Sequence, residues 1–116
     1  MKENIIKDKS FAFALRIIQL YKYLTTEQKE YVMSKQLLRS GTAIGALVRE
    51  SEHAESKADF IHKLSIALKE ANESEYWLDL LYKSAYVDEH QFTSNSNDIK
   101  EILRLLISII KSSKQK

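Results

Sequence analysis

The sequence contains no cysteine and no proline among its 116 residues, and its only glycines are Gly41 and Gly45. The absence of cysteine excludes disulfide bridges, cysteine-ligated zinc and thiol catalysis. β-Sandwiches and β-barrels need many turn residues, so this composition argues against both classes. The sequence also lacks a large excess of either positive or negative charge. The 18 basic and 16 acidic residues leave a net charge of +2, whereas nucleic-acid-binding proteins are usually strongly basic.

Long hydrophobic runs are missing as well. Arg16, Lys22 and Arg104 interrupt the longest apolar stretches, so we expect no membrane-spanning segment. The first ten residues are charged and lack the apolar core of a signal peptide, which predicts a cytoplasmic protein. The chain is long enough for one domain with its own core and too short for two. A hydrophobic content of 44% argues against disorder.

Apolar periodicity predicts four helices, at about residues 7–24, 27–53, 56–86 and 88–111. The breaks between them are short, so consecutive helices should be antiparallel neighbours. We therefore predict an all-α fold, an antiparallel up-down-up-down four-helix bundle that makes residues 1–116 a single domain.

Polar residues predict where the later helices begin. Thr25 and Gln28 have the spacing of a capping box for the second helix, and Ser56 and Asp59 for the third. The segment 93–97 is the weakest helical prediction, because its Thr, Ser and Asn side chains compete with the backbone for hydrogen bonds. The fourth helix therefore begins either near residue 88 or again near residue 97.

The first helix is apolar around much of its circumference. Its main stripe comprises Phe11, Ala14, Leu15, Ile18 and Tyr21. A second set lies beside it: Phe13, Ile17, Leu20 and Leu24. A helix of this kind needs partners on more than one side. Leu105 and Ile107 of the fourth helix also lie off its main stripe, and we expect the extra apolar residues of both helices to build a subunit interface.

Gly41 and Gly45 share one face of the second helix. Each glycine costs about 0.5–1 kcal/mol relative to alanine inside a helix, so some gain should offset the cost. We interpret the pair as a site of close helix packing, where another backbone approaches. The membrane-dimer interpretation of this spacing is excluded by the charged Arg39, Arg49 and Glu50 around it.

A charged stripe on the third helix suggests a further contact between subunits. Glu70, Glu73 and Trp77 fall on one face, and Arg39 and Arg49 of the second helix carry the opposite charge. We interpret these five residues as a salt-bridge network between subunits. The alternatives are solvated charge beside a core tryptophan and, less favoured, a small-molecule pocket. Catalysis by these acids would need raised pKa values and a cleft, and the sequence indicates neither.

The predicted topology brings both chain ends and the turn between the second and third helices to one end of the bundle. The chain ends carry candidate nucleic-acid contacts: Lys2, Lys7, Lys9, Lys111 and Lys114. The turn carries Glu50, Glu52 and Glu55, which weaken the positive field and should pair with the lysines.

Metal binding is a weak alternative at the same end. Glu50 with His53, and Asp59 with His62, match the carboxylate–histidine spacing of di-iron bundles. Both pairs flank one turn, whereas such a site needs carboxylates from all four helices near the bundle centre. We therefore predict no metal, no cofactor and no catalytic residue.

Three blocks of sequence carry a resemblance to a known family. They are QLLRSGTAIGA at 36–46, ADFIHKLSIALKEA at 58–71 and EYWL at 75–78. Together with the first and last helices they resemble the small bacterial four-helix-bundle proteins, also called 23S rRNA intervening-sequence proteins. Leu47 departs from the pattern, which usually has asparagine there, so a polar contact made by that asparagine would be lost.

The resemblance implies a four-helix bundle that assembles into a homo-oligomer, typically a pentameric ring, with no known enzyme activity. That family is also similar to accessory proteins of diversity-generating retroelements, which engage a reverse transcriptase and nucleic acid. Our first functional hypothesis is accordingly a non-catalytic oligomeric scaffold or adaptor. The alternative is an oligomer that binds RNA or DNA, or a protein partner, and a metal or small-ligand enzyme ranks last.

Overall fold

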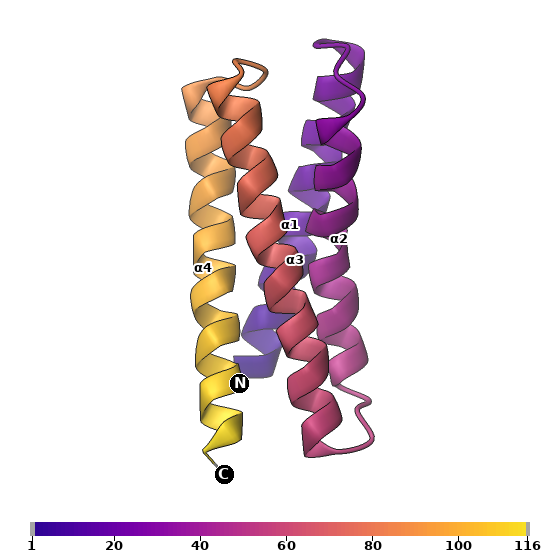
Figure 1. Ribbon diagram of the computed structural model, residues 1–116, viewed down its shortest axis with the longest axis vertical. Coiled ribbons are helices and arrows are strands. Elements are labelled where there is room, and N and C mark those ends of the chain that lie inside the picture. The colour runs from indigo at the N-terminus through magenta and orange to yellow at the C-terminus, as the bar shows by residue number, and fades with distance from the viewer. Residues whose placement is uncertain (1, 116) are drawn as a thin grey trace.

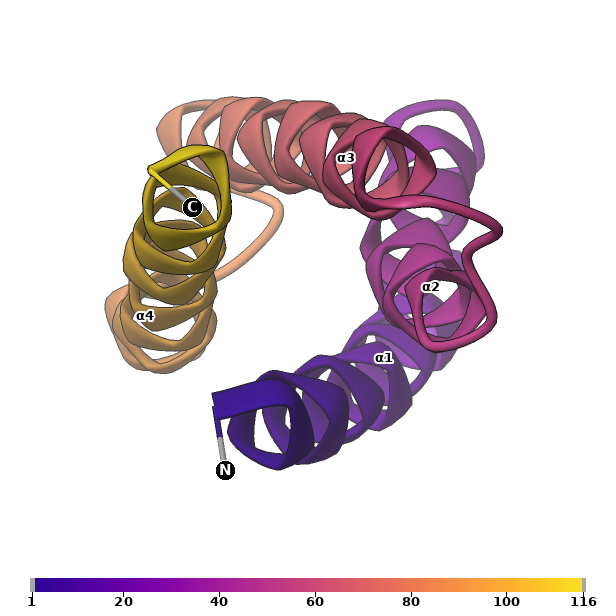
Figure 2. The same ribbon diagram turned by 90° about the horizontal axis from the view of Figure 1, so that it is seen from below.

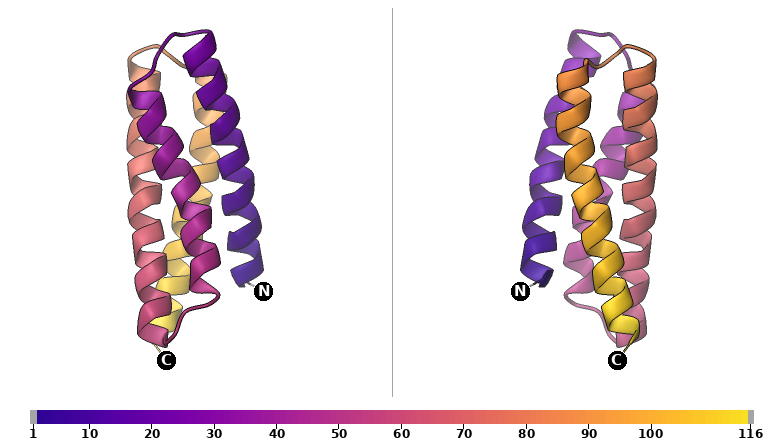
Figure 3. Two further views of the ribbon diagram at one scale, coloured as in Figure 1. Left: turned by 90° about the vertical axis from the view of Figure 1, so that its right-hand side faces the viewer. Right: turned by 90° about the vertical axis from the view of Figure 1, so that its left-hand side faces the viewer.

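The computed structural model describes the backbone of residues 2–115 and the side chains of residues 5–115. It contains four helices, α1 (Lys2–Thr26), α2 (Met33–Ser51), α3 (Lys57–Lys83) and α4 (Glu89–Lys114), and no strand within that part of the chain. The helices alternate in direction, and both described ends of the chain lie at the same end of the bundle as the α2–α3 turn (Figures 1 and 3). The predicted all-α four-helix bundle is confirmed.

Helices that follow one another in the sequence pack together, and α4 also packs against α1, which closes the bundle (Figure 2). Diagonally opposite helices share no close backbone contacts within the described residues. The core is a continuous apolar cluster with one stripe from every helix. On α1 the core stripe is the second of the two predicted sets: Phe13, Ile17, Leu20 and Leu24. The other set faces outward, so α1 is apolar on two sides.

The α1–α2 connection differs from the prediction. The first helix continues to Thr26, and the second begins at Met33 instead of residue 27. The expected capping box does not form, because the Thr25 hydroxyl donates to the Tyr21 carbonyl within α1, at 2.9 Å. The Gln28 amide donates to the Tyr23 hydroxyl, at 2.7 Å.

Glu30 caps α2 in place of that box. Its carboxylate accepts hydrogen bonds from the backbone N–H groups of Val32, Met33 and Ser34, at 3.1, 2.9 and 2.7 Å. These are donors that have no partner within the helix, and a carboxylate also suits the positive end of the helix dipole. Burial raises the pKa of the Glu30 carboxyl, but the three backbone hydrogen bonds and one from the Ser34 side chain together lower it more, so the pKa lies below its ordinary value.

We predict that Glu30→Gln lowers the free energy of unfolding by about 1 kcal/mol at pH 7, because the neutral amide is a weaker cap than the carboxylate. The folded-state pKa is depressed, so the carboxylate's contribution is complete above the unfolded-state pKa and fades as pH falls through the folded-state value. Urea unfolding at pH 7 and pH 3 measures this. A difference between variant and native protein that is as large at pH 3 as at pH 7 would contradict it.

Polar side chains also cap the two later helices, α3 at the predicted Ser56 and α4 at Asp88. The Ser56 hydroxyl accepts from the Asp59 N–H at 3.0 Å. Asp88 and Gln91 form a complete capping box at the start of α4. The helix is continuous from Glu89, so the polar segment 93–97 is helical and α4 does not restart near residue 97.

The third helix ends at Lys83, before the predicted residue 86, in a Schellman motif. The Tyr86 N–H donates to the Leu81 carbonyl at 2.9 Å, and the Ala85 N–H donates to the Tyr82 carbonyl at 3.0 Å. Ala85 takes the left-handed conformation with φ of 69°, where a Cβ is crowded.

We expect Ala85→Gly to raise the free energy of unfolding by up to about 1 kcal/mol, because glycine adopts this conformation without the Cβ penalty. Ala85 is exposed, so the substitution removes no core contact. Thermal unfolding followed by circular dichroism tests it, and a lower melting temperature would refute the cap assignment.

Both glycines of α2 face α1. A Cβ added at Gly41 would lie 3.0 Å from the Ile17 Cγ2 atom, closer than ordinary packing allows. A Cβ added at Gly45 would lie 3.5 Å from the Ser10 backbone, an ordinary contact. The two glycines therefore differ: Gly41 leaves room for a core side chain, and Gly45 lies beside the α1 backbone.

Candidate subunit interface

The outward side of α1 carries an exposed apolar stripe. Phe11 is 50% exposed, Leu15 is 49% exposed, and Ile18 is partly exposed one turn further along. The stripe borders a groove between α1 and α2 with a volume of about 270 Å³. Thr42, Gly45, Ala46 and Arg49 form the α2 side of this groove. The small side chains at Gly45 and Ala46 leave much of Phe11 and Leu15 exposed. We call Phe11, Ala14, Leu15, Ile18 and the α2 residues Gly45 and Ala46 the α1/α2 apolar face.

Two basic residues lie at the edge of this face. The Arg49 guanidinium lies over the Phe11 ring, 5.3 Å from its centroid, which is a cation–π geometry. The Lys7 ammonium lies 3.3 Å from the Glu52 carboxylate in the α2–α3 turn. Arg49 therefore covers part of the Phe11 ring, and half of Phe11 stays exposed.

The predicted charged stripe forms a cluster within one chain. Arg39 lies 2.8 Å from Glu73 and 3.9 Å from Glu70, so the two acids of α3 meet a base of α2. The Trp77 indole N–H donates to the same Glu73 oxygen that Arg39 contacts, at 3.1 Å. Arg49 is separate from this cluster and lies at the edge of the α1/α2 apolar face. A role for these five residues between subunits stays a prediction.

Ser40 and Ser74 are buried next to this cluster and have hydrogen-bond partners, whereas the buried Glu70 Oε1 atom has none among the described residues. The Ser74 and Ser40 hydroxyls lie 3.0 Å apart between α3 and α2, and both side chains are fully buried. Ser74 also lies 2.9 Å from the Glu70 carbonyl one turn earlier. Small hydroxyl residues here let α2 and α3 pack closely while each hydroxyl keeps a partner.

The candidate nucleic-acid lysines lie at the end of the bundle that the topology predicted. Lys7 pairs with Glu52, and Lys9 pairs with Glu101 of α4 at 3.2 Å. Lys111 and Lys114 are exposed in the last turns of α4. The Lys2 side chain lies outside the described part of the chain. Two of the five lysines are therefore partly neutralised by carboxylates, which weakens the attraction of this end for phosphate.

The carboxylates of the two carboxylate–histidine pairs bind other groups of the chain. Glu50 pairs with Lys63 at 3.3 Å, and the Asp59 carboxylate accepts the Glu55 N–H at 3.2 Å. Among the residues that the structure describes, no three histidine, aspartate or glutamate side chains converge on a point where a metal could bind. The same residues include no helix that is long and apolar enough to cross a membrane.

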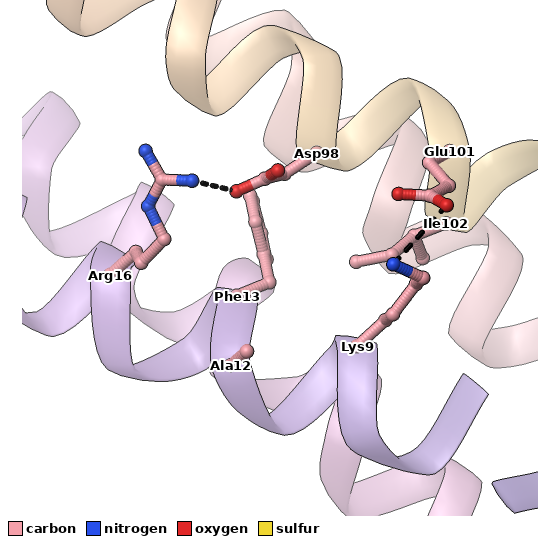
Figure 4. A pocket seen from close by; sticks show the side chains of 7 residues that line it. All are labelled: Lys9, Ala12, Phe13, Arg16, Asp98, Glu101 and Ile102. Carbon is pink, nitrogen blue, oxygen red and sulfur yellow. Dashed lines mark hydrogen bonds and ion pairs between the residues drawn. The ribbon is translucent and has the colours of Figure 1, made fainter. Parts of the chain in front are cut away.

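Sequence reasoning missed the contacts that join α1 to α4. Arg16 binds Asp98 and the Ser94 hydroxyl, while Lys9 pairs with Glu101, so two ion pairs span this seam (Figure 4). A small pocket of about 180 Å³ lies between them. The sequence does show basic residues on α1 and acidic residues on α4. Their pairing could be predicted only once it was known that α1 and α4 are neighbours.

Comparison with known families decides the classification. The model of the family described as 23S rRNA-intervening sequence protein matches residues 2–108. The chain belongs to this family. A crystal structure at 1.70 Å resolution from Bacteroides thetaiotaomicron VPI-5482 is 64% identical, with a TM-score of 0.94 over 96% of this chain and 99% of that one. It is described as a protein with unknown function from the S23 ribosomal protein family. No curated protein matches the chain.

Membership of the 23S rRNA-intervening sequence protein family agrees with the four-helix fold. It also bears on Leu47, the departure from the usual asparagine. Leu47 is partly buried and packs against the apolar core of the bundle. An apolar contact therefore stands at a position where the resemblance implies a polar side chain.

Proposed function

We propose that this chain is a non-catalytic scaffold that assembles with copies of itself through the α1/α2 apolar face. The observation that carries the proposal is the exposed stripe of Phe11, Leu15 and Ile18. Complete burial of such side chains stabilises an association by about 1.5–3 kcal/mol each, and roughly half of that remains available here. Exposed contiguous apolar surface on a small protein marks an interaction site.

The assembly that the resemblance implies is a pentameric ring. A closed ring uses heterologous contacts, in which two different surfaces of each copy meet. The α1/α2 apolar face supplies one surface. Ile107 on the outward side of α4 is 53% exposed and is the candidate for the other, in line with the extra apolar residues of that helix.

The rival hypothesis, binding of RNA or DNA, gains no specific support from the candidate lysines. Lys7 and Lys9 have carboxylate partners within their own chain, and phosphate would have to compete with them. A ring of several copies would still multiply weak contacts, so the hypothesis is best judged on the assembled protein.

Thiol labelling tests the proposed interface, because the chain has no cysteine of its own. Leu15→Cys places one thiol on the α1/α2 apolar face, and Glu55→Cys places a control thiol in the exposed α2–α3 turn. We expect a maleimide to modify the residue 15 thiol at least tenfold more slowly at 100 µM protein than at 0.1 µM, and the residue 55 thiol equally fast at both. Equal rates at residue 15 would reject the interface.

A further inference from the structure

A second groove lies in the seam between α1 and α4, in the half of the bundle that is remote from the chain ends. Its volume is about 270 Å³. Gln19 and Tyr23 of α1 form one wall, and His90, Gln91 and Asn95 of α4 form the other. The groove is separate from the α1/α2 apolar face, and polar and apolar surface contribute about equally to its lining.

Asn95 is the unusual residue of this groove. Its side chain is only 6% exposed, on the buried stripe of α4. The side-chain amide donates to the Gln91 carbonyl at 2.9 Å, but its Oδ1 atom has no hydrogen-bond partner among the described residues. A buried acceptor without a donor costs free energy that a leucine of similar size would avoid. Stability therefore does not explain an asparagine at this position, and a bound donor would.

The other residues that line the groove indicate which kind of molecule could carry that donor. Tyr23 of α1 and His90 of α4 contribute aromatic rings to the lining, and the Gln19 and Gln91 side chains contribute amides. Arg16, at the edge, is already paired with Asp98, so the groove carries no free positive charge from it. A neutral, planar and donor-bearing molecule matches this lining better than an anion does.

We propose that the α1/α4 groove binds a neutral nitrogen heterocycle with an exocyclic amine, the chemistry of an adenine or cytosine base, which donates an N–H to Asn95 Oδ1. The Oδ1 atom is closed off from solvent in the ligand-free chain, so the ring reaches it only when α1 and α4 move apart at this groove. Arg16 bridges the helices by its bonds to Asp98 and Ser94, and it shifts when the ring enters.

Adenosine and N6,N6-dimethyladenosine form a matched pair of probes, since only adenosine has an amine hydrogen to donate. Titration into the full chain is followed by backbone amide NMR. We expect adenosine to shift the signals of Tyr23 and Asn95, and the dimethyl compound to bind at least tenfold more weakly, the loss of about one hydrogen bond. No shift at millimolar adenosine, or equal binding of both probes, would overturn the proposal.

Asn95→Leu supplies a second, independent readout. We expect it to abolish adenosine binding and to raise the melting temperature of the ligand-free protein, because it removes the unsatisfied acceptor. Asn97→Leu, on the exposed side of the same helix, should leave adenosine binding unchanged. A lower melting temperature for Asn95→Leu would show that Oδ1 is satisfied without a ligand and would remove the basis of the site.

A short oligoadenylate distinguishes two sources of the base. If it binds more tightly than adenosine, the base belongs to a nucleic-acid strand, and equal affinity assigns it to a free nucleoside. Either result supports the site.

Discussion

Replacing both Phe11 and Leu15 with glutamate is expected to dissociate the proposed homo-oligomer into 13.5 kDa monomers at micromolar concentration. The two side chains are half exposed in the single chain, so the substitutions leave its core intact. In the assembly they would place two carboxylates in an apolar contact that excludes water, which costs several kcal/mol per copy. Multi-angle light scattering after size exclusion measures the mass.

A matched variant separates this effect from added charge alone. Tyr31 and Val32 are also exposed and apolar, but they lie in the α1–α2 connection at the end of the bundle. Replacing both with glutamate adds the same charge and should leave the mass of the assembly unchanged. Dissociation by this control, or an intact assembly after the Phe11 and Leu15 substitutions, would show that the α1/α2 apolar face is not the contact surface.

Gly41→Leu is expected to lower the free energy of unfolding by about 3 kcal/mol and the melting temperature by roughly 10 °C. The first added atom already lies 3.0 Å from Ile17, and Ile17 is completely buried, so neither side chain can move into solvent. The leucine must push α1 away from α2. Circular dichroism melting at equal protein concentration provides the comparison.

Gly45→Ala serves as the control for that prediction. Its added methyl group meets the Ser10 backbone at an ordinary 3.5 Å, while alanine has the higher helix propensity, by up to about 1 kcal/mol. We expect Gly45→Ala to melt at the same temperature as the native protein or higher. If Gly41→Leu melted as the native protein does, the close packing inferred from both glycines would be wrong.

The helices could be predicted from the sequence because their apolar spacing is strongly periodic, but the α1–α2 connection could not. A serine or threonine three residues before a glutamine or glutamate resembles a cap wherever it occurs. At Thr25 the hydroxyl instead bonds back into α1, and Glu30 caps α2 from a position that periodicity does not mark. The choice depends on where α1 ends against its neighbours, which is a tertiary property.

The candidate interface shows the same limit. The sequence predicted that α1 needs partners on two sides, and the structure assigns one side to the core and leaves Phe11 and Leu15 uncovered. Periodicity alone could not decide which stripe of α1 faces the core and which faces outward, because both stripes have helical spacing. The charged cluster of Arg39, Glu70 and Glu73 was visible as complementary charge, yet its pairing within one chain follows from the packing of α2 against α3.

The mass of the unmodified protein in solution tests the central claim most directly. Size exclusion with light scattering, from 1 to 100 µM, should give one discrete species at a multiple of 13.5 kDa, and at about five times that mass if the ring implied by the resemblance forms. A monomer of 13.5 kDa across the whole range would contradict self-assembly through the α1/α2 apolar face.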